Sequence, residues 1–178
     1  MKKLIILFSL LFLVTGCMGY HELNELRIIN NIYLKKTTAY ETTFNEVLPK
    51  KDDFTYSKKY LKHYYSNKSL NKIFNKDKKM YFSHLEYIVI NTNFTKQDLI
   101  KLVNILKKKL ELREKFYIFI SNNYLSLKDT DIFKELLNNK KILNFYNIKK
   151  KINNKEKVTL PIVKISNNVL KIIKYKSY

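Results

Sequence analysis

Short apolar runs and one helical repeat of leucines follow each other along the centre of this chain. Residues 81–90 and 116–120 are continuous apolar stretches rich in β-branched and aromatic side chains, which is typical of buried strands. Between them, apolar residues recur every three or four positions over 96–110, which predicts an amphipathic helix. Thr95 and Asp98 match a capping box at its start. This order predicts a βαβ crossover with parallel strands.

Further strands are predicted on both sides of this crossover. Residues 27–34 and 39–48 have apolar patterns typical of strands, and two β-like runs at 158–165 and 169–175 flank an Asn-Asn pair that favours a hairpin. Residues 54–65 alternate aromatic side chains with lysines, a pattern either of a half-buried strand, which we favour, or of a stacking surface for single-stranded nucleic acid. The expected fold class is α+β, with a mixed sheet, the crossover and a C-terminal hairpin.

Composition and charge patterning divide the chain into four segments. Residues 1–16 have the features of a leader, and residues 17–138 contain most of the predicted strands and helices. Residues 139–157 are rich in Lys and Asn and are predicted to be a linker. Residues 158–178 form the predicted hairpin, which we interpret as the start of a truncated later domain.

The residues that are scarce exclude several kinds of site. The chain of 178 residues has only two glycines, so it lacks every Gly-rich phosphate-binding loop. Its one cysteine excludes an intrachain disulfide and a cysteine-based zinc cluster. The three histidines have no recognised metal-ligand spacing, so we expect neither a metal nor a cofactor.

The net charge of +20 comes almost entirely from lysine, because only two of the 35 basic residues are arginines. Surfaces that read phosphates usually favour Arg, whose planar fork binds two oxygens at once. We therefore expect no specific nucleic-acid partner.

The amino terminus has the pattern of a bacterial lipoprotein signal. Two lysines precede an apolar stretch over 4–14, which is too short to span a bilayer. Small residues at Thr15 and Gly16 then precede Cys17, as in a lipobox. We predict that cleavage leaves Cys17 as the first residue, carrying two acyl chains that anchor it stably.

The remaining candidate chemistry is sparse. His84 lies within the most apolar predicted strand, next to Ser83, and neighbours on a strand point to opposite faces, so the two cannot act as a catalytic pair. We expect His84 to be a buried structural residue with a hydrogen-bond partner, and the protein not to be an enzyme. An exported hydrolase would require His84 and a carboxylate to meet in a cleft.

Three stretches resemble the amino-terminal part of the Ger(x)C spore-germination lipoproteins, the C subunits of nutrient germinant receptors. Cys17 is followed by YHELNELRII at 20–29, similar to the family's aromatic residue, R-E-[LI]-N-[DE]-L and strand. KMYFSHLEYIVI at 79–90 resembles K-x-[LIV]-[FY]-F-[SG]-H and its following strand. Arg113 stands where the family has R-D-P-E-[IL]-R. The structural motif residues are therefore Tyr81, Phe82, Ser83, His84 and Arg113.

This resemblance implies a non-catalytic subunit on the outer face of the spore's inner membrane, beside multi-spanning receptor subunits, that acts in spore germination. The family's large C-terminal domain is missing. The segment nearest the anchor is expected to bind the membrane partner through Tyr20, Glu22, Leu23, Asn24, Leu26 and Arg27. The alternative is a peripheral lipoprotein that binds peptidoglycan, an anionic polymer or nucleic acid, because anchor and charge fit that as well.

Overall fold

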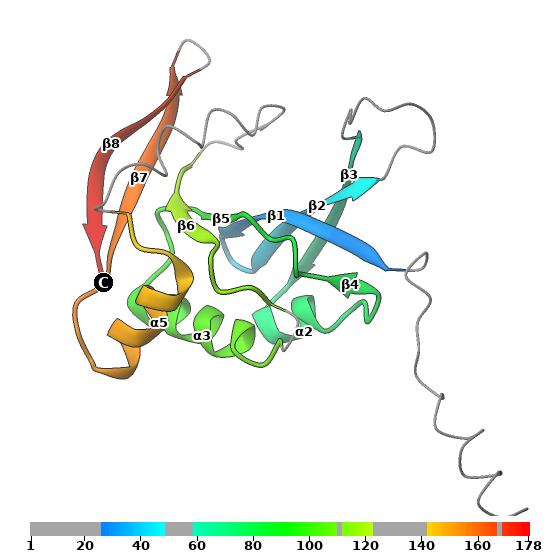
Figure 1. Ribbon diagram of the computed structural model, residues 1–178, viewed down its shortest axis with the longest axis horizontal. Helices are drawn as coiled ribbons and strands as arrows, with labels where there is room; N and C mark the ends of the chain where they lie inside the picture. Colours follow the sequence, from blue (N-terminus) through cyan, green and yellow to red (C-terminus); the bar gives the residue numbers. More distant parts are fainter. Residues whose placement is uncertain (1–25, 49–58, 110–111, 123–141, 167–168) are drawn as a thin grey trace, which may run out of the picture.

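A computed structural model describes residues 26–48, 59–109, 112–122, 142–166 and 169–178, which form one sheet and three helices (Figure 1). The strands are β1 (Arg27–Lys36), β2 (Tyr40–Leu48), β3 (Lys59–Asn67), β4 (Met80–Tyr81), β5 (Tyr87–Ile90), β6 (Tyr117–Ile120), β7 (Thr159–Ser166) and β8 (Val169–Ser177). The helices are α2 (Leu70–Phe74), α3 (Lys96–Leu106) and α5 (Phe145–Asn153). The strand order is β3-β2-β1-β5-β6-β7-β8, with β4 beside β1.

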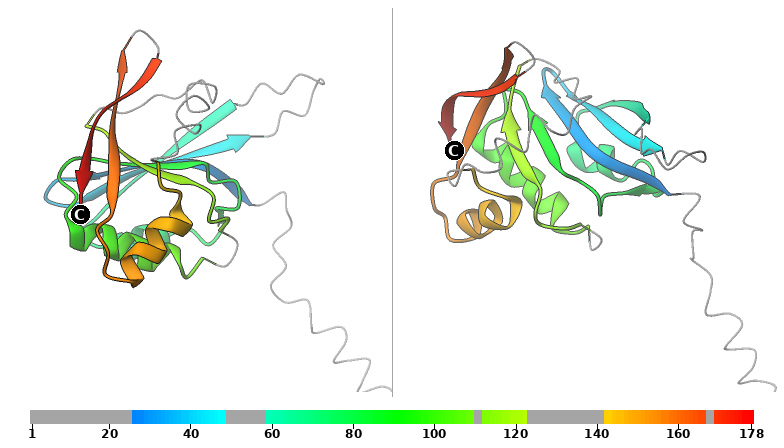
Figure 2. Two further views of the ribbon diagram at one scale, coloured as in Figure 1. Left: turned by 60° about the vertical axis from the view of Figure 1, so that its left-hand side comes forward. Right: turned by 45° about the horizontal axis from the view of Figure 1, so that its top comes forward.

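The sheet is mixed, as the sequence predicts. Strands β1, β5, β6 and β7 are parallel, while β2 and β3 at one side and β8 at the other are antiparallel to their neighbours. The predicted βαβ crossover is confirmed by β5, α3 and β6, and the predicted hairpin by β7 and β8. The three helices lie together on one face of the sheet (Figures 1 and 2).

The core lies between this helical layer and the sheet. Alternate residues of three parallel strands are fully buried there: Ile32, Leu34, Ile88, Ile90, Ile118 and Ile120. Val89 and Phe119 point to the other face and are buried in a second, smaller cluster. Burial on both faces explains why β5 and β6 are continuous apolar runs without alternation.

Helix α3 packs through the stripe that its sequence predicts. Leu99, Leu102, Val103 and Leu106 are buried, and the capping box between Thr95 and Asp98 is present in full. The helix ends at Leu106, four residues before the predicted end.

The single buried strand predicted for residues 81–90 is wrong. β4 ends at Tyr81, a turn follows in which the Leu85 amide donates to the Phe82 carbonyl, and β5 begins only at Tyr87. Phe82 and Leu85 enter the core from this turn, whereas His84 is exposed. The turn resembles a strand in the sequence because most of its side chains are apolar and buried. The prediction of a buried His84 is therefore also wrong.

The predicted linker over 139–157 is wrong for residues 145–153, which form α5. The Asn144 side chain caps this helix by accepting from the Asn147 amide, and Phe145 and Ile148 are buried. Phe145 stacks on Phe116, with ring centroids 4.5 Å apart. Because only two of its nine residues are buried, the helix has little apolar signal in the sequence.

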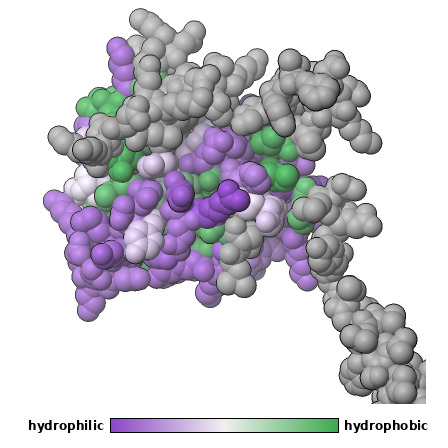
Figure 3. Space-filling model, viewed as in Figure 1, coloured by the Kyte–Doolittle hydropathy of each residue, from purple (hydrophilic) through white to green (hydrophobic). Residues whose placement is uncertain are grey.

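The hairpin continues the same sheet, since Ile162 of β7 pairs with Ile120 of β6. Pro161 is the third residue of β7, near the start of the strand. Surface residues over α3 and α5 are mainly hydrophilic (Figure 3). Cys17 and residues 20–25 lie outside the described residues, as do 54–58 of the predicted strand over 54–65.

Candidate functional site at the amino-terminal edge of the sheet

The amino-terminal ends of β1, β5 and β6 share one edge of the sheet, because the three strands are parallel (Figure 2, right). Asn31, Tyr87 and Tyr117 lie at the same level across the three strands. Arg27 and Arg113 each precede that level by four residues. We call this side of the sheet the amino edge; the described chain enters β1 here, at Leu26 and Arg27.

Two of the segments that carry the family resemblance meet at the amino edge. The Arg27 guanidinium donates to the Asp77 carboxylate at 2.7 Å, and the Arg27 amide donates to the Lys79 carbonyl at 2.8 Å. Arg27 and Ile28 of β1 pair in parallel with Met80 and Tyr81 of β4. The start of β1 is thus joined to the second motif by backbone bonds, and to Asp77, two residues before that motif, by a side-chain bond.

Residues 82–84 of the second motif, the segment over 79–90, support this edge through core packing and backbone contacts. Phe82 is fully buried and contacts the rings of Phe44 and Phe74, with centroids 6.2 and 6.0 Å away. Ser83 is buried, and its hydroxyl has no hydrogen-bond partner among the residues that the structure describes. The His84 carbonyl accepts from the Asn30 side chain at 3.4 Å, while the imidazole is exposed. The motif therefore acts through packing and backbone geometry.

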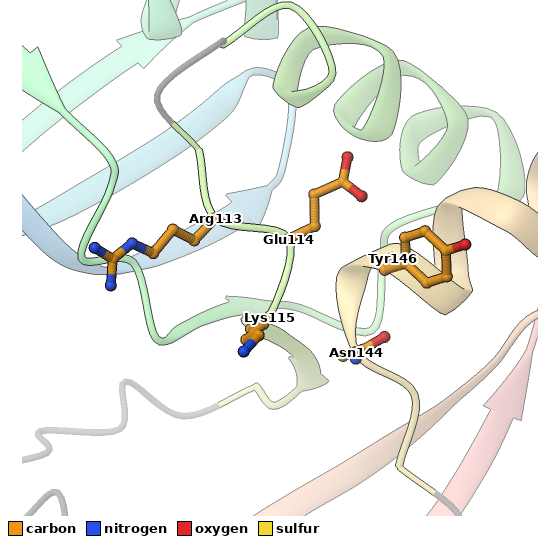
Figure 4. Close-up of a pocket in the computed structure, with 5 residues that line it drawn as sticks. All are labelled: Arg113, Glu114, Lys115, Asn144 and Tyr146. Atoms are coloured by element: carbon orange, nitrogen blue, oxygen red, sulfur yellow. The ribbon is translucent and has the colours of Figure 1, made fainter.

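Arg113 borders a hollow of about 580 Å³ beside the start of β6 (Figure 4). Its walls come from the loop before β6 and from the start of α5: Arg113, Glu114, Lys115, Asn144 and Tyr146. Glu114 forms an ion pair with Lys149, whereas Arg113 and Lys115 are exposed and pair with no described residue. The Tyr146 ring is 52% exposed at the rim. In Figure 4 the Arg113 guanidinium extends away from Tyr146, so the lining side chains spread over the surface instead of converging.

The positive character of this hollow comes from side chains and not from the first amides of α5. The Phe145 and Tyr146 amides donate to the carbonyls of Phe116 and Glu114, and the Asn147 amide donates to the Asn144 side chain. These donors are consequently not available to an anion, which helix starts otherwise bind readily.

The opposite, carboxyl edge of the sheet holds a different polar cluster, centred on Asp98. This residue is 2% exposed and accepts from Lys36 Nζ and the Tyr40 hydroxyl, each at 2.6 Å, and from Thr95. Burial alone would raise the pKa of Asp98, but these hydrogen bonds outweigh it and hold the pKa well below its usual range. Burial and then the hydrogen bond to Asp98 raise the pKa of Tyr40 to about 12.

A second, partly buried pair joins β2 and β3. His63 Nε2 lies 2.5 Å from a Glu46 carboxylate oxygen. Sequence reasoning missed both this pair and the contacts of Lys36 and Tyr40, because each joins residues far apart in the chain. Among the described residues, no three His, Cys, Asp or Glu side chains are grouped so that they could hold a metal ion.

Of the residues predicted to bind a partner, the structure describes Leu26 and Arg27, and both lie at the amino edge. Tyr20, Glu22, Leu23 and Asn24 precede the described chain. Arg113 lies at the same edge, and among the described residues it forms no hydrogen bond or ion pair with the other motif residues. Lys115 and Tyr146, which share its hollow, were not anticipated, because only the fold places α5 beside the loop before β6.

The resemblance to the Ger(x)C lipoproteins is supported by its sequence motifs and not by the comparisons with known proteins. No protein-family model, no curated protein and no solved structure matches the chain. In the part of the chain that the structure describes, none of the helices has both the length and the apolar character needed to cross a membrane.

Proposed function

We propose that this protein is a lipid-anchored, non-catalytic subunit of a nutrient germinant receptor that acts in spore germination. Cys17 carries the acyl chains on the outer face of the spore's inner membrane, and the partners are multi-spanning receptor subunits. The observation that carries this proposal is the junction at the amino edge, where Arg27 and the segment over 77–81 are joined.

This junction supports the resemblance because the two most specific motifs are neighbours in space. A backbone hydrogen bond of 2.8 Å joins the Arg27 amide of the first motif to the Lys79 carbonyl of the second. Two motifs that jointly build one edge form a physical unit. Such a unit next to a tether is well placed to bind a partner in the same membrane, since tethering raises its effective concentration there.

The length of the tether between Cys17 and β1 also supports placing the amino edge next to the membrane. Arg27 is ten positions after Cys17, and a fully extended chain over ten positions reaches about 35 Å. The amino edge is therefore the part of the described fold that a lipid on Cys17 holds nearest to the bilayer.

The described polar groups favour binding over catalysis. Asp98 is saturated by hydrogen bonds in a buried junction, and Glu46 is paired with His63. In the hollow at Arg113 the one carboxylate, Glu114, is held by Lys149. A hydrolase would instead place an acid and a base together, within reach of one reacting group.

Co-purification from spore membranes tests the partner assignment. Glu22→Ala combined with Asn24→Ala should abolish recovery of the multi-spanning subunits, because these two side chains lie in the expected contact segment. The control is a triple variant of exposed lysines on and after α5, Lys150→Gln, Lys155→Gln and Lys157→Gln, which should retain them. The reverse result would contradict the assignment and favour the alternative lipoprotein that binds an anionic polymer.

Mass spectrometry of the membrane fraction tests the anchor separately. The expected species begins at Cys17 and carries diacylglycerol. Unmodified Cys17 with residues 1–16 still attached would contradict the proposal, and Cys17→Ala should release or misprocess the protein.

A further inference from the structure

The amino edge also carries a basic surface whose cations pair with no residue that the structure describes. Its cations are Lys78, beside the Arg27 junction, and Arg113 and Lys115, in the loop before β6. All three side chains are exposed, and none pairs with a residue that the structure describes. Other cations at this edge are neutralised locally, Arg27 by Asp77 and Lys149 by Glu114.

An amphipathic aromatic side chain lies at the same surface. The Tyr146 amide is bound to the Glu114 carbonyl, which fixes this residue beside Arg113 and Lys115. Its ring is 52% exposed even though α5 buries other aromatic surface. Tyrosine with an apolar ring and a polar tip is favoured at membrane interfaces, where one end is apolar and the other wet.

We propose that this surface, made by Lys78, Arg113, Lys115 and Tyr146, docks onto the headgroups of anionic phospholipids. The inference rests on the proposed anchor, since a lipid on Cys17 brings this edge to the bilayer. The spread arrangement of the cations in Figure 4 suits a plane of phosphates better than one enclosed phosphate. Each Lys or Arg near an anionic membrane contributes about 1 kcal/mol, or roughly a fivefold change in binding.

Docking would fix the orientation of the fold on the membrane. The tether alone allows the domain to rotate about its attachment. Contact through both β4 and the loop before β6 would hold the amino edge against the bilayer and keep the hairpin β7–β8 away from it (Figure 1).

Vesicle binding by the unlipidated chain tests the inference. The protein is residues 17–178 with Cys17→Ser, which retains every described residue. The vesicles are phosphatidylcholine alone, or equal parts of phosphatidylcholine and phosphatidylglycerol. The triple variant Lys78→Gln, Arg113→Gln, Lys115→Gln should bind the anionic vesicles at least about tenfold more weakly than wild type.

A matched triple variant controls for total charge. Lys164→Gln, Lys171→Gln and Lys174→Gln remove three exposed cations from the hairpin and should weaken binding much less. Arg113→Lys should bind like wild type, because the charge and not the planar fork is required. Circular dichroism should show all these variants to be folded, since every substituted side chain is exposed.

Three outcomes would overturn the inference. The first is an equal loss of binding in both triple variants, which would show that only total charge matters. The second is wild-type binding that is no tighter to anionic than to neutral vesicles. The third is wild-type binding to anionic vesicles that soluble glycerol phosphate abolishes at equal phosphate concentration. None of these results depends on the receptor subunits, so failure here is distinguishable from failure of the co-purification experiment.

Discussion

The two edges of the sheet use charge in opposite ways. At the carboxyl edge, Asp98 is buried and accepts hydrogen bonds from Lys36, Tyr40 and Thr95. At the amino edge, Arg113 and Lys115 are exposed and have no described partner. Charged groups that are paired within the fold stabilise it. Exposed charged groups that have no partner among the described residues are available to bind another surface. The contrast separates polar residues that the fold already pairs from those that it leaves exposed, in a chain with a net charge of +20.

Among substitutions of polar residues, removing the Asp98 carboxylate should produce the largest effect on stability. Asp98→Ala leaves Lys36 and Tyr40 without their acceptor and removes the Asp98 half of the capping box of α3, so we expect a loss of about 3 kcal/mol in the free energy of unfolding. Urea denaturation measures it. The control, Arg113→Gln with Lys115→Gln at the amino edge, should change stability by less than about 0.5 kcal/mol. Equal losses of unfolding free energy in the two variants would contradict the contrast between a structural carboxyl edge and an amino edge that contributes little to stability.

The pH dependence of stability should reveal the same carboxylate. Because the folded pKa of Asp98 is depressed, its contribution is present above the unfolded pKa of about 4 and is lost as the pH falls below that value. Tyr40 behaves in the opposite way: its raised pKa means that stability is lost as the pH rises from 10 towards 12. Asp98→Asn should flatten the acid limb of a stability profile, and an unchanged limb would contradict this assignment.

Parts of the fold with a strong local pattern were predictable from the sequence. The α3 stripe and its capping box lie within twelve consecutive positions, and the sequence predicts both. The turn at 82–86 was missed because burial of Phe82 and Leu85 gives it the apolar composition of a strand. Helix α5 was missed for the opposite reason, since its exposed lysines and asparagines outnumber its two buried residues.

The candidate site was predictable only where a motif marked it. Arg113 was singled out through the family resemblance, but its neighbour Tyr146 is brought beside it by a backbone bond to Glu114. Lys36 and Asp98 are 62 residues apart and meet only because β1 and β5 pair. Such long-range contacts leave no periodic signal in a single sequence.

A smaller effect is expected at the end of α5, the helix whose start borders the amino-edge hollow. Lys155 has φ 59°, and the Lys155 and Glu156 amides donate to the Ile152 and Lys151 carbonyls, a Schellman arrangement that favours glycine. Lys155→Gly should therefore stabilise the protein by about 1 kcal/mol.

The matched control for that substitution lies within the same helix. Lys150→Gly, at an exposed interior position, should destabilise by about 1 kcal/mol. Thermal unfolding of both variants measures the difference, and two changes of the same sign would show that the left-handed residue is not strained. Each substitution removes one positive charge, and it should weaken binding to anionic vesicles by no more than the loss of that charge explains.

The smallest effect is expected for His84, at the amino edge. Its imidazole is exposed and only its carbonyl is used, by Asn30, so His84→Ala should change the free energy of unfolding by less than about 0.5 kcal/mol. Phe82→Ala, two positions earlier and fully buried, should cost about 3–5 kcal/mol and serves as the contrast. A loss above 1 kcal/mol for His84→Ala would show that the imidazole is structural after all. A stable His84→Ala variant that fails to recover the receptor subunits would instead place this side chain in the contact, beside Arg27, and extend the binding surface along the amino edge.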